Sequence, residues 1–111
     1  AQAPGWFTTA PIGAIQQALS RAKLALGDVD LWEINEAFAV VPMAAARELD
    51  IPENRLNTRG GACALGHPIG ASGARIIVTL LNAMEAEEAH HGVAALCIGG
   101  GEGTAVTLQR P

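Results

Sequence analysis

The chain has 111 residues, with 7 lysines and arginines against 11 aspartates and glutamates, and a formal net charge of -4. An acidic chain lacks the basic face that displaces counterions from nucleic acid, so nucleic acid is excluded as a partner. No apolar run approaches the roughly 18 residues of a membrane-spanning helix, and no charged-then-apolar leader precedes the first helix, so neither a membrane nor secretion is expected. Two cysteines do not form a disulfide framework, which favours a reducing, cytoplasmic compartment.

The composition is apolar for a single small domain. Hydrophobic residues make up 50% of the chain and charged residues 16%, against about 25% charged in typical domains. A domain of this size has much surface for its volume and should be more polar. We therefore expect part of its surface to be covered by something else. Because Ala1 is not a methionine, we also expect residues 1–111 to be one piece of a longer chain or a processed product.

The first half of the chain predicts a helix, a strand and a second helix. Apolar residues at helical spacing predict a helix over residues 10–26, with Thr9 as N-cap and Gly27 as C-cap. Alternating residues predict a strand over 31–35. The second helix is expected over 36–49, where proline should bend it or move its start later, because proline removes one donor of the helical ladder.

The second half predicts a buried helix followed by two strands. A polar loop over 50–59 leads into a glycine-dense stretch, 60–73, which opens a helix through about residue 88, ended by Gly92. Its residues 76–81 are apolar on every side, which predicts burial all round.

Strands are expected over 93–98 and 103–108, with a glycine turn between them. The order of elements predicts a layered α/β fold with a mixed sheet, a buried helix and a closing β-hairpin.

Three side chains suited to chemistry stand beside glycine clusters or at strand ends. His67 lies in the stretch 60–73, Cys97 precedes the turn 99–101, and Asn35 ends the first strand. Glycine clusters and strand ends are where α/β folds place their sites. Each residue also has a purely structural interpretation: the histidine as a backbone cap, the cysteine as a small buried hydrophobe, and the asparagine as a helix start.

Two other kinds of site are disfavoured by the pattern. The glycines at 99–103 lack the downstream lysine and hydroxyl residue of a phosphate-binding loop and precede a strand instead of a helix. No metal site is expected, because the cysteines and histidines show no pair at ligand spacing; His90 and His91 are better explained as partners of a helix C-terminus.

Taken together, three strings carry a resemblance to a known family. NEAF (residues 35–38), N-x-x-GGA-x-ALGHP-x-GASGAR (57–75) and CIGGG (97–101) stand in this order, and the stretches 8–25 and 28–41 add to the match. The chain resembles the thiolases, the acetyl-CoA C-acetyltransferase family, over nearly its whole length. The resemblance implies that residues 1–111 are part of the C-terminal domain of the layered thiolase fold.

The resemblance also implies roles for individual residues. His67 would activate the nucleophilic cysteine and contribute to an oxyanion site, which Asn35 completes through a water. Cys97 would be the general acid and base for the second acetyl-CoA, and its pKa would be lowered by a nearby imidazole. The backbone N–H of Gly99 would serve a second oxyanion hole.

Along the same lines, Ala37 and Phe38 would lie along the pantetheine arm of the substrate. The substrate would be a coenzyme A thioester, with no separate cofactor.

One departure from the family pattern is important. The family's nucleophilic cysteine, which lies in the N-terminal half, has no counterpart here. Cys63 stands where the family has an aliphatic residue and is therefore predicted to be core.

The function that the resemblance implies for this chain is the C-terminal part of an acetyl-CoA acetyltransferase. It would be inactive alone, complete only with the missing N-terminal half, and homo-oligomeric in the complete protein. The alternative is a non-catalytic, truncated assembly or interaction domain.

Overall fold

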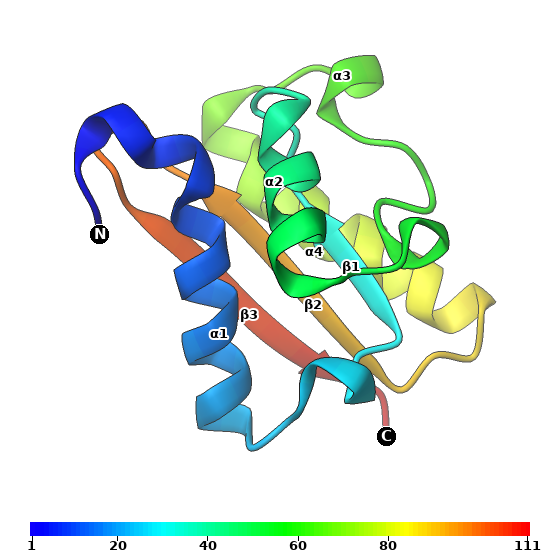
Figure 1. The fold of residues 1–111 in the computed structure, drawn as a ribbon. Coiled ribbons are helices and arrows are strands. Elements are labelled where there is room, and N and C mark those ends of the chain that lie inside the picture. The colour runs from blue at the N-terminus through cyan, green and yellow to red at the C-terminus, as the bar shows by residue number, and fades with distance from the viewer.

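The molecule is built from one small sheet between two helical layers. The computed structural model describes residues 1–111. In chain order the elements are η1 (Pro4–Thr9), α1 (Ala10–Ala22), η2 (Leu26–Asp28), β1 (Leu31–Ile34), α2 (Val40–Leu49), η3 (Glu53–Arg55), α3 (Ala62–Leu65), α4 (Ile69–Ala86), β2 (His91–Cys97) and β3 (Gly103–Gln109). Helices α1 and α2 cover one face of the sheet, and α4 lies against the other (Figure 1).

The sheet is mixed, with strand order β1-β2-β3. Strand β1 pairs parallel to β2, with Ile34 opposite Ala95, and β2 pairs antiparallel to β3, with Cys97 opposite Gly103. The predicted α/β class and closing hairpin are therefore confirmed. Because β1 and β2 run in parallel, their carboxyl ends lie at the same edge of the sheet. We call this the carboxyl edge.

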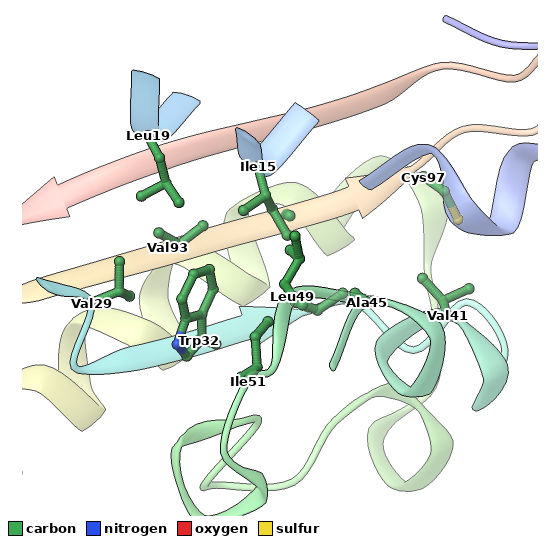
Figure 2. Close-up of a cluster of buried hydrophobic side chains, with 12 residues drawn as sticks. Ile15, Leu19, Val29, Trp32, Val41, Ala45, Leu49, Ile51, Val93 and Cys97 are labelled. Atoms are coloured by element: carbon green, nitrogen blue, oxygen red, sulfur yellow. The ribbon is translucent and has the colours of Figure 1, made fainter. Parts of the chain in front are cut away.

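Side chains that alternate along the strands fill two separate cores. Val93, Ala95 and Cys97 of β2 contribute to a cluster of 12 buried residues that also includes Ile15 and Leu49 from the covering helices (Figure 2). On the other face, a cluster of 7 buried residues joins the sheet to α4. Strands β1 and β2 are thus buried on both sides, which explains the nearly continuous apolar run of β2, whereas β3 alternates between partly buried and exposed residues.

Helix α1 is shorter than its apolar spacing predicted. It ends at Ala22, and Lys23, with φ 57°, is the left-handed residue that follows it, while Gly27 lies in η2. Thr9 is the N-cap residue, as predicted, but its hydroxyl does not cap the helix: it donates to the Trp6 carbonyl at 2.9 Å. Since residues 4–9 already form a helical turn, the first N–H group of α1, that of Ala10, donates to the Phe7 carbonyl there.

Helix α2 begins later than residue 36, as its proline suggested. It runs Val40–Leu49, which places Pro42 in the first turn, where the missing N–H has no partner to lose.

Helix α4 is only half buried within these residues. It ends at Ala86 and Glu88 takes φ 54°, so Gly92, which lies inside β2, is not its stop. Val78 is 57% exposed and Leu81 is 49% exposed, against the prediction of burial on every side. A second covering layer would be needed for that burial, and residues 1–111 do not supply it. None of the helices is both long and apolar enough to span a membrane.

The contact of β3 with α1 yields a stability prediction. A Cβ added at Gly103 would overlap the backbone carbonyl of Ala10, whereas one at Gly13, inside α1, meets nothing within 4 Å. We expect Gly103→Ala to lower the free energy of unfolding by about 1–3 kcal/mol through overpacking. The matched control Gly13→Ala should raise it by about 0.5–1 kcal/mol through the entropy of the unfolded chain. Urea unfolding of both variants measures this; an equally stable Gly103→Ala would contradict the α1–β3 packing.

Candidate functional site

Asn35 is the residue immediately after β1, at the carboxyl edge. Its backbone N–H donates to the Ala95 carbonyl at 2.9 Å, and its side chain is fully buried. Its Oδ1 accepts a hydrogen bond from Arg75 Nη2 at 3.1 Å. Because side chains alternate along a strand, Glu33 and Asn35 both face α4. The amide is therefore held by a helix residue 40 positions further along the chain.

Arg75 also binds the buried carboxylate of Glu33. Its Nη1 lies 2.8 Å from Glu33 Oε1, with the Glu33 side chain 3% exposed. Burial raises the pKa of Glu33 to about 7, and the guanidinium opposes this rise only in part. Glu33, Asn35 and Ser72 are the buried polar side chains of the chain, and all three lie in this region. Burying polar groups costs free energy, so their concentration at one place marks a site.

The loop that carries His67 is fixed by the carboxylate of Glu36. Its Oε2 accepts the backbone N–H of Cys63 at 2.8 Å, near the start of α3, and its Oε1 accepts Asn57 Nδ2 at 3.3 Å. A Cβ at Gly61 would lie only 2.5 Å from that carboxyl carbon, so a side chain here would displace the Glu36 carboxylate from its present position. The NEAF string is thereby joined directly to the glycine-dense stretch.

Asn57 acts as a substitute strand residue along the free side of β1. Its Oδ1 accepts the Ile34 N–H at 2.8 Å, and its Nδ2 donates to the Ile34 carbonyl at 2.9 Å. These two bonds satisfy the last backbone groups of the strand next to Asn35. They also anchor the beginning of the loop that leads to His67.

The structure brings His67 and Asn35 together, as their common site assignment requires. After Gly66, which turns the chain with φ 88°, the half-buried His67 ring lies with Nδ1 3.4 Å and Nε2 3.5 Å from Asn35 Nδ2. Ser72 Oγ lies 2.5 Å from His67 Nδ1 and donates to the Pro68 carbonyl at 3.1 Å. The hydroxyl has a single hydrogen, so a Ser72 that donates to Pro68 can only accept at Nδ1, which favours the tautomer with the proton on Nδ1 and the lone pair on Nε2.

Cys97 lies at the same edge, two residues beyond the position opposite Ile34. Its side chain is 6% exposed and belongs to the cluster on the α1 and α2 face (Figure 2), whereas Asn35 faces α4. Burial raises the pKa of the Cys97 thiol, so the expected lowering by an imidazole is wrong. That Cys97 meets His67 around one substrate carbonyl stays a prediction.

The remaining assigned residues lie close by. Gly99 is exposed in the turn after β2, and its backbone N–H has no partner in the chain, so it is free to donate. Ala37 packs against the larger core, and the exposed Phe38 meets Phe7 edge to face, with ring centroids 6.1 Å apart. Their contact with a pantetheine arm stays a prediction.

Cys63 is not a core residue, contrary to the expectation from the sequence. Its thiol is exposed, and the neighbouring carboxylate of Glu36 raises its pKa. The residue sits in the second position of α3, where its backbone N–H is held and its side chain points outward. No group of three histidine, cysteine or acidic side chains is gathered closely enough to hold a metal ion.

Sequence reasoning missed the residues that hold the site in place. Ser72 and Arg75 stand inside the GASGAR string, but nothing in the pattern gave them a task. Glu33 carried the clearest signal, because an acidic residue in the middle of an apolar strand must find a partner when buried. Glu36 and Asn57 looked like an ordinary helix start and loop residue.

Known proteins match the chain over nearly its full length. A family model described as "Thiolase, C-terminal domain" matches residues 1–110. A probable acetyl-CoA acetyltransferase of Dictyostelium discoideum is 55% identical over 109 residues, 98% of this chain and 26% of that protein. The cytosolic acetyl-CoA acetyltransferase of Mus musculus is 55% identical over 107 residues, 96% of this chain and 27% of that protein. This chain thus spans about a quarter of the length of these curated relatives.

Two solved structures share the fold. The Acat5 thiolase from Ascaris suum, in complex with coenzyme A, superposes with a TM-score of 0.92 at 48% identity, covering 99% of this chain and 28% of that one. Human mitochondrial 3-ketoacyl-CoA thiolase superposes with a TM-score of 0.94 at 44% identity, covering 97% of this chain and 27% of that one.

The contact of Ser72 with His67 predicts a single imidazole tautomer. In the neutral ring of the wild-type chain we expect the proton on Nδ1, and in Ser72→Ala a mixture of tautomers, because the only acceptor at Nδ1 is removed. The ¹⁵N shifts of the ring nitrogens measure this directly. His90 and His91, at the far end of β2, are internal controls whose shifts should not change. A wild-type His67 protonated at Nε2 would disprove the assignment.

The raised pKa of Glu33 predicts an unusual pH dependence of stability. Its carboxyl holds a proton more tightly in the folded chain than in the unfolded chain, where the pKa is 4.5. Its contribution to stability is therefore complete below about pH 4.5 and is lost as the pH rises through about 7. Glu33→Gln cannot ionise and has no such loss. The unfolding free energy of the variant, relative to that of the wild type, should therefore increase as the pH rises from about 4.5 to about 7. Urea unfolding on either side of the window measures it, and a pH-independent difference would refute the raised pKa.

Proposed function

The chain belongs to the thiolase family, where it corresponds to the C-terminal domain, and on this premise we propose that it supplies the acid–base half of an acetyl-CoA acetyltransferase site. The complete enzyme condenses two acetyl-CoA molecules, or cleaves acetoacetyl-CoA and 3-ketoacyl-CoA, through an acyl-cysteine intermediate. The observation that carries this proposal is the contact of His67 with Asn35 at the edge where Cys97 also ends its strand.

The nucleophilic cysteine comes from outside these residues in this proposal. Cys97 is assigned to proton transfer, and Cys63, whose raised pKa makes it a poor nucleophile, is assigned no role. The open apolar side of α4, including Val78 and Leu81, supports a covering layer from the missing N-terminal part. We accordingly expect residues 1–111, as part of one C-terminal domain, to be inactive alone.

In the first half-reaction, His67 Nε2 takes the proton of the nucleophilic thiol. The thiolate attacks the thioester carbonyl of acetyl-CoA, and the negative oxygen is stabilised by the protonated imidazole and by a water held by Asn35. When the carbon–sulfur bond to coenzyme A breaks, Cys97 donates its proton to the departing thiolate. A buried thiol with a raised pKa suits this step, because it keeps its proton until a base of comparable strength appears.

In the second half-reaction, the Cys97 thiolate takes an α-proton from the second acetyl-CoA. The resulting enolate oxygen is stabilised by donors that include the free N–H of Gly99. The enolate carbon attacks the acyl-cysteine carbonyl, the carbon–sulfur bond to the enzyme breaks, and the imidazolium of His67 returns a proton to the nucleophile. Acetoacetyl-CoA leaves, and every group has recovered its starting protonation state.

The substrates, cellular location and assembly of the enzyme are proposed on the same premise. The substrates are coenzyme A thioesters that pass along Ala37 and Phe38, and the reaction needs no separate cofactor. The names of the mouse and rat relatives place those proteins in the cytosol, which supports a cytoplasmic location for this one. We also propose that the complete enzyme is a homo-oligomer and contributes to fatty acid metabolism.

A chimaera tests the function. Residues 1–111 replace the matching part of mouse cytosolic acetyl-CoA acetyltransferase, and acetoacetyl-CoA formation and thiolysis are measured. We expect activity in the chimaera, and a loss of about 10²–10⁴-fold in kcat for His67→Ala and for Cys97→Ala, as removal of an acid–base group typically costs. Cys63→Ala is the matched control and should retain full activity.

Two results would contradict the proposal. A folded but inactive chimaera would favour a non-catalytic assembly domain, and full turnover by the Cys97→Ala variant would remove this thiol from the mechanism. The isolated chain provides a third check. Mass spectrometry after incubation with acetyl-CoA should find no acetyl group on Cys97, and its acetylation would mean that the nucleophile is present here after all.

A further inference from the structure

We propose that Arg75, braced by Glu33, is a positioning residue that sets the orientation of the Asn35 carboxamide, so that its N–H donors face His67 and the reacting carbonyl. The inference rests on the proposed function and extends it to two residues for which neither the motif resemblance nor the similarity to known proteins provides a role. Three contacts support it: Glu33 with Arg75, Arg75 with Asn35, and Asn35 with His67.

A carboxamide has two ends of nearly equal size and opposite chemistry. The Oδ1 end accepts hydrogen bonds and the Nδ2 end donates them, so a half-turn about the last side-chain bond exchanges acceptor for donors without changing shape. Only the donor end can hold the oxygen of a water that completes an oxyanion site. The orientation of Asn35 therefore decides whether the amide presents donors or an acceptor to the site, and only the donor end leaves both hydrogens of that water free for the oxyanion and other partners.

Arg75 removes this ambiguity because a guanidinium has donors and no acceptor. Its Nη2 lies 3.1 Å from Asn35, and only the Oδ1 end of the amide can accept there. The Nδ2 end is then directed to the His67 ring, where it lies 3.4 Å from Nδ1 and 3.5 Å from Nε2. Since Asn35 is fully buried, bulk water does not compete for either end.

Glu33 fixes Arg75 in turn. Its Oε1 receives Nη1 at 2.8 Å, so the two terminal nitrogens of one planar group are divided between a carboxylate and an amide. Lysine has a single nitrogen and cannot reproduce this fork. A buried ion pair is costly to desolvate and contributes little net stability, so a role in orientation explains its presence better than a role in stability.

The test is a double-mutant cycle between Arg75 and Asn35 in the complete enzyme, either the longer chain that carries this segment or the active chimaera. Asn35→Ala should lower kcat about 100-fold, as loss of one oxyanion donor does. Arg75→Met should lower kcat about 10- to 100-fold with little change in KM, as misplacement of a catalytic group does. The double variant should be no slower than Asn35→Ala alone, because Arg75 acts only through that amide.

Two further variants separate positioning from a general loss of structure. Arg75→Lys should give an intermediate kcat and should show the same non-additivity, and it replaces Arg75→Met in the cycle if the latter does not fold. Arg59→Met is the matched control: it removes an arginine from the exposed ion pair with Glu87, 3.3 Å long, and should leave kcat unchanged.

The outcomes distinguish this inference from the proposed function. If the fall in kcat of the double variant equals the product of the falls in the two single variants, or if an Arg75 variant has wild-type kcat, the positioning role is overturned. The proposed function is left intact by either result. Wild-type turnover by Asn35→Ala would instead remove Asn35 from the proposed mechanism, and this inference with it. A drop in kcat for Arg59→Met as large as for Arg75→Met would show that the loss is not specific to the site and would also overturn the inference.

Discussion

Parallel pairing of β1 with β2, in the register that sets Ile34 opposite Ala95, brings the two strand ends that carry the site to one edge of the sheet. Strands about 60 residues apart in sequence end at one edge because a helical crossover returns the chain in the same direction. The positions of Asn35 and Cys97 at this edge follow directly from this register. A slip by one residue would exchange the two faces of β1, moving the Asn35 amide away from α4 and its core residues out of the core.

Polar groups at this edge are stabilised by contacts that link three separate segments. Glu33 of β1 and Asn35 directly after it meet Arg75 of α4, while Glu36 holds the start of α3 and so the approach to His67. Each contact satisfies a buried or half-buried polar atom, which is the condition for keeping such groups in an apolar interior. The network explains why the motifs of this chain, which lie far apart in sequence, form one connected structure.

The two faces of the sheet are buried to different extents. The α1 and α2 side has a closed core of 12 buried residues, whereas α4 packs on the sheet with one side and exposes Val78 and Leu81 on the other. This difference accounts for the apolar excess seen in the composition. It also fits a chain that spans about a quarter of its relatives, in which the outer side of α4 is where a further layer would add to the fold.

The sequence by itself determined the α/β class, the hairpin and the assignment of Asn35 and His67 to one site, because periodicity, proline and glycine positions and long motifs are local signals. It missed the true end of α1, since a left-handed Lys23 replaces the expected glycine, and it placed the exposed Cys63 in the core. Only the tertiary structure decided the direction in which the pKa of Cys97 shifts and the polar groups that surround the His67 ring and the Asn35 amide. These depend on burial and on partners such as Ser72 and Arg75, which long-range packing, not neighbouring sequence, brings within hydrogen-bond distance.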